Sequence, residues 1–417
     1  MKKNAIILFL LMALPTLLLT SCLKDQEDVF EESASARTAN YLSNAKKVLT
    51  SAENGWLLNY YPDRDQSYGG TPYVLKFSDE TVEVSSELAG DPTYSVESTY
   101  VLRNEDGPVL MFDTYNELMH YFATPSGSSG AGGYEAYDGD FIFIILGISA
   151  DQDTITLKGS RSGNVMYMYR LPGSGVDYLS KVLETEETMP VNYTFNVQDE
   201  IVNVTLSGGT ASFISPSKKV NELMAYIYTD RGIEFYEPVE IYGTVLNGIV
   251  NSGEAAVTSS IGDSPVQMKV VFLPINEIFV NTDWYLSYAN LGEFAKPYFD
   301  KAIAGSASEG EIISMMAFTL INGNFSLYFL SGKYPGALAF STEYIGEDQI
   351  RLTYNPANNY SNGNWYYKNA GYNNLLVPLE RTFRLESNSK IRPTVVRMVD
   401  TEEPTNVITV TTSAASF

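Results

Sequence analysis

The 417-residue sequence contains one cysteine, Cys22, and one histidine, His120. A lone cysteine cannot close an internal disulfide bond, so packing has to hold the fold together. A lone histidine excludes a zinc site built on histidines, a histidine-paired nucleophile and bis-histidine haem ligation. The HExxH, P-loop and GxSxG motifs are absent as well. We interpret His120, within Leu118–Phe122, as a histidine at the edge of a strand beside aromatic residues.

Positive charge is also scarce. Lysine and arginine number 27 against 50 aspartates and glutamates, which gives a formal net charge of −23. This balance argues against nucleic-acid partners and against binding of anionic head groups by charge. Apolar residues make up 44% of the chain, enough for hydrophobic cores, and 30 tyrosines together with frequent turn dipeptides favour β-meanders.

The N-terminus has the pattern of an export signal. Lys2 and Lys3 precede an apolar stretch over 5–19, and small residues then lead to Cys22. The apolar stretch is too short for a spanning helix. The sequence therefore predicts a lipoprotein signal peptide over 1–21, with Cys22 acylated as the new N-terminus and attached to the membrane. A plain secretion signal and a retained apolar helix are the alternatives.

A polar, acidic stretch follows the cysteine, and we expect a tether over 22–33. Its residues 23–28, with a lysine before acidic side chains, resemble the surface-export tag of Bacteroidetes lipoproteins. That resemblance implies an outer-membrane lipoprotein exposed at the cell surface. An ordinary polar tether is the alternative, which leaves the periplasmic face open.

The rest of the chain predicts a mainly β protein with a few short helices, arranged as β-meander barrels or sandwiches of lipocalin-like type. Two domains are expected. The first, over 34–189, begins with a helix at 34–53, and the second, over 190–417, contains a helix near 290–304. Strands with period-two alternation and short turns fill both ranges, and Glu117–Phe122 is one of them.

Two stretches of the chain are similar to each other. Tyr100–Leu118 and Tyr226–Tyr242 both show a strand, an acidic turn with glycine, and a second strand. Two copies of a unit made of a helix followed by a meander would explain the similarity.

Pairs of aspartates occur in or beside turns, and Asp138 with Asp140 is the best candidate for a metal site. Calcium binds such oxygen clusters, but it needs six or more oxygens and the EF-hand pattern is absent. Aspartate also stabilises turns by accepting hydrogen bonds from backbone amides. We favour the turn, with calcium as the alternative, and the sequence indicates no other cofactor.

An aromatic and asparagine-rich segment lies near the C-terminal end, where Trp365, Tyr366, Tyr367 and Tyr372 are interspersed with asparagines. Aromatic faces stack on sugar C–H groups and amides bond hydroxyls, so these four residues are candidate glycan ligands. Packing in a long surface loop is the alternative.

Several stretches resemble the uncharacterised Bacteroidetes outer-membrane lipoproteins of domain-of-unknown-function family 4302. They are 51–62, 107–116, 158–164 and 232–238. The resemblance implies an outer-membrane lipoprotein, often encoded near TonB-dependent transporters and SusD-like proteins. The family has no assigned catalytic residues, so the resemblance assigns no catalytic residue to this chain.

Three functions stay open at this point. The leading one is a non-catalytic ligand-binding or accessory lipoprotein for nutrient acquisition, with glycan as a candidate nutrient. A carboxylate-based glycan hydrolase is the second, because 50 acidic residues supply many pairs. A structural or adhesion protein of the cell surface is the third.

Overall fold

The computed structural model describes residues 33–105, 107–125, 136–262, 265–414 and 416–417. The predicted signal peptide, Cys22 and almost all of the predicted tether lie outside these residues. Among the residues described, no helix has the length and apolar character needed to cross a membrane. Strands hold 45% of the residues and helices 19%, which confirms the predicted mainly β fold class.

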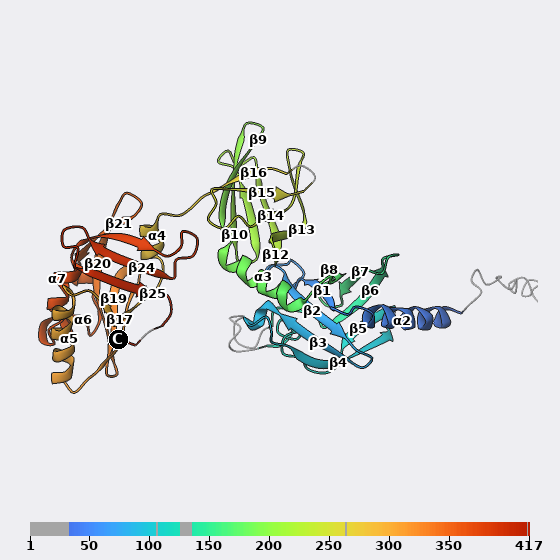
Figure 1. The fold of residues 1–417 in the computed structure, drawn as a ribbon, viewed down its shortest axis with the longest axis horizontal. Helices are drawn as coiled ribbons and strands as arrows, with labels where there is room; N and C mark the ends of the chain where they lie inside the picture. The colour runs from blue at the N-terminus through green and yellow to red at the C-terminus, as the bar shows by residue number, and fades with distance from the viewer. Residues whose placement is uncertain (1–32, 106, 126–135, 263–264, 415) are drawn as a thin grey trace, which may run out of the picture.

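The strands form three units, which Figure 1 shows in blue to teal, green to yellow, and orange to red. The first barrel consists of β1 (Trp56–Tyr60), β2 (Thr71–Phe77), β3 (Thr81–Ser86), β4 (Val96–Asn104), β5 (Pro108–Phe112), β6 (Ile142–Ile148), β7 (Thr154–Gly159) and β8 (Val165–Arg170). The second barrel consists of β9 (Asn192–Val197), β10 (Glu200–Ser207), β11 (Thr210–Ile214), β12 (Asn221–Thr229), β13 (Gly232–Ile241), β14 (Thr244–Val250), β15 (Val257–Ile261) and β16 (Gln267–Val270). The third consists of β17 (Trp284–Leu291), β18 (Ile313–Ile321), β19 (Asn324–Ser331), β20 (Tyr334–Ile345), β21 (Gln349–Tyr354), β22 (Tyr360–Ser361), β23 (Thr382–Ser387), β24 (Val395–Asp400) and β25 (Val407–Thr411).

Each unit is an antiparallel ring in which successive strands are neighbours. The last strand pairs with the first, so that β8 pairs with β1, β16 with β9 and β25 with β17. In the third unit β20 pairs with both β19 and β21, which completes that ring, while the short β22 pairs with β20 beside it. Closure pairs both edges of each ring and so removes the exposed edges that an open sheet presents. The predicted C-terminal range, 190–417, therefore holds the second and the third barrel.

A helix precedes each barrel, and further short helices follow β3, β17, β21 and β22. They are α2 (Ala34–Thr50), α3 (Gly175–Thr188), α4 (Ile275–Val280), α5 (Lys296–Ser308), α6 (Gly363–Asn369), α7 (Leu376–Leu379), and the single turns η1 (Glu87–Ala89), η2 (Pro356–Asn358) and η3 (Tyr372–Leu375). The predicted helix over 34–53 forms as α2. Ser33 caps this helix by accepting a hydrogen bond from the amide of Ala36 at 3.2 Å.

The first strand of each barrel is fixed to the chain just before it by an aromatic side chain. Trp56 donates its indole N–H to the carbonyl of Leu49 at 2.9 Å, and Trp284 donates to the carbonyl of Phe279 at 2.9 Å. The hydroxyl of Tyr193 in the second barrel donates to a backbone carbonyl just before β9, at 2.6 Å. The sequence suggested two copies of a helix-plus-meander unit, whereas the structure contains three. The two similar stretches coincide with β4–β5 and β12–β13, which are the fourth and fifth strands of their barrels.

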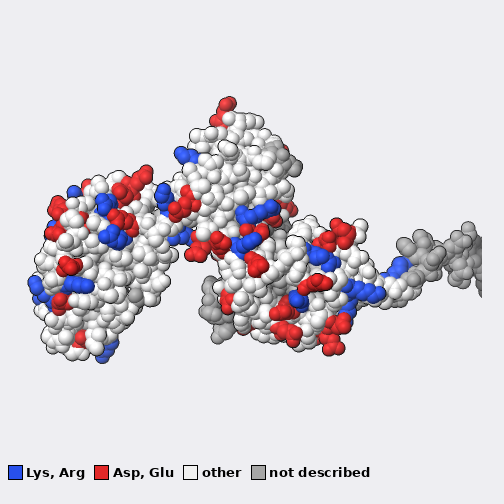
Figure 2. Space-filling model, in the orientation of Figure 1, with Lys and Arg blue, Asp and Glu red and all other residues white. Residues whose placement is uncertain are grey.

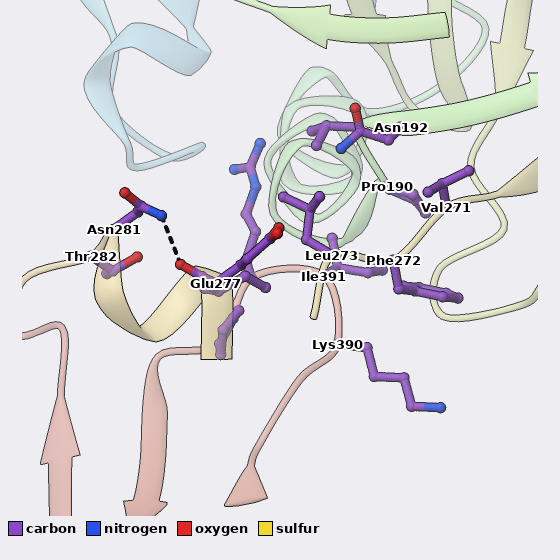
Figure 3. A pocket seen from close by; sticks show the side chains of 14 residues that line it. Pro190, Asn192, Val271, Phe272, Leu273, Glu277, Asn281, Thr282, Lys390 and Ile391 are labelled. Atoms are coloured by element: carbon purple, nitrogen blue, oxygen red, sulfur yellow. Dashed lines mark hydrogen bonds between the residues drawn. The ribbon is translucent and has the colours of Figure 1, made fainter. Parts of the chain in front are cut away.

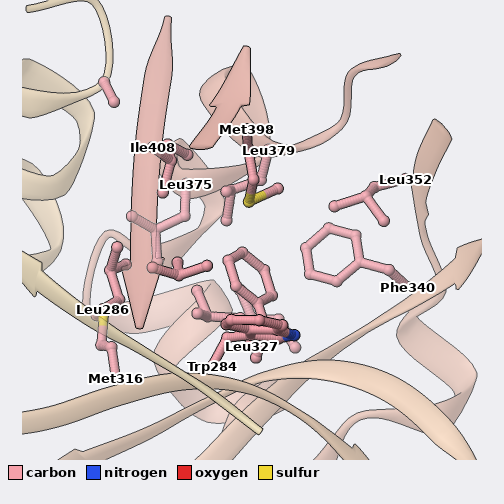
Figure 4. Close-up of a cluster of buried hydrophobic side chains, with 14 of the residues drawn as sticks. Trp284, Leu286, Met316, Leu327, Phe340, Leu352, Leu375, Leu379, Met398 and Ile408 are labelled. Carbon is pink, nitrogen blue, oxygen red and sulfur yellow. The ribbon is translucent and has the colours of Figure 1, made fainter. Parts of the chain in front are cut away.

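Large apolar side chains fill the barrel interiors. The first core contains Trp56, Tyr73 and Phe143, and the second contains Tyr193 and Phe213, all nearly fully buried. Figure 4 shows the third core, in which residues such as Trp284, Leu327, Phe340 and Met398 converge from several strands. Burial of each such side chain stabilises the fold by about 1.5–3 kcal/mol. The barrels are therefore packed cores, and ligand sites have to be sought on their outer surfaces and at their junctions.

Two predicted elements differ from the structure. The helix predicted near 290–304 is α5, Lys296–Ser308, because Leu291 is the last residue of β17 and Pro297 occupies the first turn of the helix. The predicted strand over Glu117–Phe122 is wrong, since this segment forms turns. The side chain of Asn116 stabilises these turns by accepting hydrogen bonds from two backbone amides, at 3.2 and 3.1 Å.

The first two barrels meet through their backbones. Gly69 and Gly209 lie so close that a Cβ atom on either would overlap the other, and both have positive φ, at 70° and 81°. The amide of Gly70 donates to the carbonyl of Tyr226 at 2.9 Å. α3 adds to this junction, since its buried Leu179 packs against β1 and β2 while the helix also contacts β12 and β13.

Candidate functional site

The four predicted glycan ligands do not form one surface. Trp365 on α6 is 44% exposed, whereas Tyr366 and Tyr372 are buried in the third core at 2% and 0%. Tyr367 is partly buried and stacks on Tyr354, with ring centroids 4.9 Å apart. Of the four, Trp365 is the one with a large exposed fraction, and the buried Tyr366 and Tyr372 cannot stack on a sugar.

Tyr366 and Tyr372 belong instead to a polar network beneath α6. Tyr366 donates to the carboxylate of Glu311, which also accepts a hydrogen bond from Ser331 Oγ at 2.7 Å. The hydroxyl of Tyr372 lies 3.0 Å from Ser306 Oγ. Burial raises the pKa of Tyr372 to about 12 and also raises the pKa of Tyr366. Both phenols therefore stay neutral at physiological pH, and they attach α5, α6 and η3 to the barrel.

Two other exposed aromatic residues lie on the segments next to Trp365. Tyr334 at the start of β20 is 43% exposed, and Tyr360 on β22 is 42% exposed. Asn362 connects these segments, since its side chain donates to the carbonyl of Pro335 at 2.9 Å and its own carbonyl accepts from the amide of Trp365 at 2.9 Å. We call Tyr334, Tyr360 and Trp365 the aromatic corner.

Asparagine side chains surround the aromatic corner and are held in fixed orientations. Asn359 Nδ2 donates to Tyr354 Oη at 2.8 Å and to Asn364 Oδ1 at 2.9 Å. Asn359 Oδ1 also accepts from the amide of Ala339 in β20, at 2.9 Å. Fixed amides next to exposed rings provide both kinds of contact that a sugar uses, apolar stacking and hydrogen bonding.

The predicted calcium ligands lie together but are bound by the protein itself. Asp138 forms an ion pair with the guanidinium of Arg161. Asp140 is 2% exposed, and its carboxylate accepts hydrogen bonds from the amides of Arg161 at 2.5 Å and Ser162 at 3.2 Å. Within the described part of the chain, no three His, Cys, Asp or Glu residues are grouped to hold a metal ion. The turn interpretation fits Asp140, whose carboxylate accepts from backbone amides, whereas Asp138 forms a side-chain ion pair instead.

We expect Asp140→Ala to lower the free energy of unfolding of the first barrel by about 1–3 kcal/mol, because it leaves buried amide donors unpaired. Thermal melts with and without calcium measure this. Asp138→Asn is the control, since it removes an exposed ion pair worth less than about 1 kcal/mol while asparagine tolerates the positive φ of 54° at this position. A rise in the melting temperature of the unsubstituted protein on calcium addition, lost in Asp140→Asn, would show that Asp140 binds the metal.

His120 is 9% exposed and lies in the turn after β5 rather than at a strand edge, so that part of its interpretation is wrong. Its Nδ1 lies 3.2 Å from the amide nitrogen and 3.0 Å from the carbonyl oxygen of Asn116. Its ring packs beside those of Phe141 and Tyr115, with centroids 4.6 and 5.4 Å away. Burial lowers the pKa of His120, which keeps the ring neutral and suits a structural role.

A groove of about 400 Å³ lies between the second and the third barrel, and Figure 3 shows it from close by. The chain that joins the two barrels and the loop between β23 and β24 form its walls. Its lining residues are Pro190, Val191, Asn192, Val271, Phe272, Leu273, Glu277, Ile278, Asn281, Thr282, Lys390, Ile391, Arg392 and Pro393. We call it the second junction groove.

Another groove, of about 620 Å³, lies between the first and the second barrel, and we call it the first junction groove. It is lined by Asp65, Gln66, Ser67, Thr210, Leu223, Met224, Ala225, Tyr236 and Glu237. The buried Asn164 fixes one wall, since its side chain donates to the carbonyls of Tyr61 at 3.0 Å and Asp63 at 2.5 Å. Asp63 and Gln66 have positive φ, at 59° and 52°, which costs conformational energy that these hydrogen bonds offset.

Sequence reasoning missed both grooves because each combines side chains that are about 100 residues or more apart. No local pattern marks Asp65 and Glu237 as neighbours of one cavity. The sequence feature nearest to the first junction groove was the acidic pair Asp63 and Asp65, which the sequence places in a turn.

Comparisons with known proteins identify a family but no activity. The family model described as Domain of unknown function (DUF4302) matches residues 26–252. No curated protein matches the chain. Among solved structures, the DNA polymerase β subunits of Streptococcus pyogenes and Streptococcus pneumoniae are 8% and 10% identical, with TM-scores of 0.13 and 0.12. Their matches cover 91% and 90% of this chain and 98% of each of those chains.

These structural similarities are too weak to carry an argument about fold or function. The family match, by contrast, covers more than half of the chain and confirms the resemblance to domain-of-unknown-function family 4302. It runs through the first barrel and through the second as far as β14, whereas the third barrel lies beyond it. The chain therefore belongs to the family described as Domain of unknown function (DUF4302).

Proposed function

We propose that this protein is a lipid-anchored, non-catalytic component of nutrient acquisition at the outer face of the outer membrane, and that its ligand is a glycan. The export signal, Cys22 and the acidic residues that follow it support the anchor and the location. A TonB-dependent transporter or SusD-like complex is the partner that the family setting suggests. Figure 2 shows basic side chains beside acidic ones on the face in view, without the broad basic surface that nucleic acid needs.

The aromatic corner is the observation that carries the proposal of a glycan ligand. Tyr334, Tyr360 and Trp365 each leave more than two fifths of their surface open to solvent. The asparagines around them are held by hydrogen bonds, so little conformational freedom is lost when a ligand binds. Such a surface can bind a sugar chain without any reactive group.

We expect Trp365→Ala to weaken glycan binding about tenfold, which corresponds to about 1.4 kcal/mol. A glycan array identifies the ligand, and isothermal titration of the soluble chain from Ser33 measures its dissociation constant. Tyr344→Ala is the matched control, because Tyr344 is 45% exposed on the same strand as Tyr334 but at its other end. Loss of binding in Tyr344→Ala, equal binding in Trp365→Ala, or a blank array would contradict glycan capture at this surface.

One observation favours a second candidate function. Asp65 and Glu237 both line the first junction groove, and a glycosidase needs two carboxylates across a cleft. Release of reducing ends from a bound glycan, lost in Asp65→Asn and in Glu237→Gln, would establish a hydrolase instead. A structural or adhesion role that relies on strand addition has less support, because both edges of each ring are paired.

A further inference from the structure

The second junction groove has apolar walls that remain accessible to solvent. Val271 and Leu273, on the chain between β16 and α4, are 38% and 48% exposed. Phe272 on the same connecting chain and Ile391 in the loop between β23 and β24 line the same cavity. Figure 3 shows Leu273 and Ile391 near the centre of the view, between α4 on one side and the second barrel on the other. Exposed apolar side chains around a concave surface are typical of an interaction site.

Charged side chains lie at the border of these walls. Lys390 and Arg392 belong to the loop between β23 and β24, and Glu277 belongs to α4. None of the three forms an ion pair with another residue that the structure describes, although ten ion pairs form elsewhere. The groove therefore carries two cations and one anion in a chain whose net charge is −23. Two more carboxylates, those of Glu187 and Glu254, line an adjoining cavity that Arg392 also lines, and they offset part of this positive charge.

The loop that carries the two cations is fixed in place. The amide of Lys390 donates to Glu254 Oε1 of the second barrel at 2.8 Å, which ties the loop across the junction. Ser389 Oγ accepts from the amides of Ile391 and Arg392 at 3.1 and 3.3 Å. The Lys390 ammonium lies 5.9 Å from the centre of the Phe272 ring, so its stem covers part of the apolar wall. A fixed loop presents both cations without a large ordering cost when a ligand binds.

We propose that the second junction groove binds an acidic, partly apolar peptide segment of a partner protein. Apolar side chains of such a segment would contact Leu273 and Ile391, and its carboxylates would pair with Lys390 and Arg392. Asn192 and Thr282, which also line the groove, can bond peptide main-chain groups. A sugar would leave most of its hydroxyls against apolar walls here, where they lack partners. This site is separate from the aromatic corner and does not depend on it.

The test uses two fluorescein-labelled peptides of equal length, one of alternating glutamate and leucine and one of alternating lysine and leucine. Fluorescence anisotropy with the soluble chain from Ser33 measures the binding of each. We expect the acidic peptide to bind at least tenfold more tightly than the basic one, with an affinity that falls as salt rises. The double variant Lys390→Glu with Arg392→Glu should lose this preference, and Leu273→Ser should weaken binding several-fold.

Lys181→Glu is the matched control, because Lys181 is an exposed residue of α3 that does not line the groove. It should bind the acidic peptide as the unsubstituted chain does. Thermal melts establish that each variant is folded before its affinity is read. Equal binding of both peptides, no binding, or unchanged binding in the double variant would overturn the proposal. Displacement of the acidic peptide by polygalacturonate at equal carboxylate concentration would also overturn it, since the groove would then accept an acidic polysaccharide.

Discussion

Replacing Trp284 by alanine is expected to lower the free energy of unfolding of the third barrel by about 3–5 kcal/mol. The indole is fully buried, and it stacks on the ring of Phe279 with centroids 5.8 Å apart. It also donates to the carbonyl of Phe279, so the substitution leaves both a cavity and an unpaired carbonyl. Chemical denaturation followed by circular dichroism measures the loss.

The other two tryptophans provide the controls. Trp365→Ala should lower the stability of the third barrel much less than Trp284→Ala, because Trp365 is 44% exposed and lies outside the buried core. Trp56→Ala should destabilise the first barrel and leave the unfolding of the third unchanged, since the two barrels have separate cores. If Trp56→Ala and Trp284→Ala shifted one common transition by the same amount, the barrels would not be independent units.

The second large effect on stability is expected at Glu87, in the turn η1 that follows β3. This turn also contacts α3. Its Oε2 atom is buried and has no hydrogen-bond partner among the described residues. Burial raises the pKa of Glu87 well above its usual value, and the nearby carboxylate of Glu186 raises it further. The folded protein therefore holds a proton that the unfolded chain loses at lower pH. Stability is greatest below the unfolded pKa of about 4.5 and falls as the pH rises towards the folded pKa.

Glu87→Gln should remove this dependence, because glutamine does not titrate. We expect the variant to gain about 1–3 kcal/mol relative to the unsubstituted protein at pH 8, the cost of a buried charge without partners, and to gain little at pH 4.5. Thermal melts at pH values between 4.5 and 8 measure how steeply the stability of each protein changes with pH. Glu105→Gln serves as the control for an exposed carboxylate. Parallel pH profiles for Glu87→Gln and the unsubstituted protein would show that Glu87 is not the group responsible.

The sequence predicted the fold class because strand alternation and helical spacing are local properties. The helix over 34–53 is an example, since its apolar residues recur at helical spacing and the buried Val48 and Leu49 face the first barrel. The segment over 117–122 was wrongly predicted to be a strand. Leu118 and Met119 are apolar and buried, as in a strand, but they lie in turns. Whether the strands after residue 190 form one unit or two depends on pairing between β9 and β16 and between β17 and β25. Such pairing joins positions far apart in the chain, and no local pattern specifies it.

The site predictions also depend on how much local sequence can specify. Trp365 lies on the surface as a sugar-binding residue requires, but its neighbour Tyr366 points into the core, because a helix directs successive side chains to different faces. Tyr334 joins Trp365 through the contact of Asn362 with Pro335, which only the folded chain reveals. Both junction grooves depend on the packing of whole barrels against each other, and this lies beyond any motif in the sequence.

The pairing of first and last strands in every ring has a consequence for how the chain can be assembled from parts. Because β1 and β8, β9 and β16, and β17 and β25 are hydrogen-bonded neighbours, the chain enters and leaves each barrel at a single seam. A unit with adjacent termini can be gained, lost or exchanged without redirecting the chain on either side. The third barrel, which carries the aromatic corner, can therefore change in sequence as a separate domain. The two linked barrels before it can keep their shared geometry.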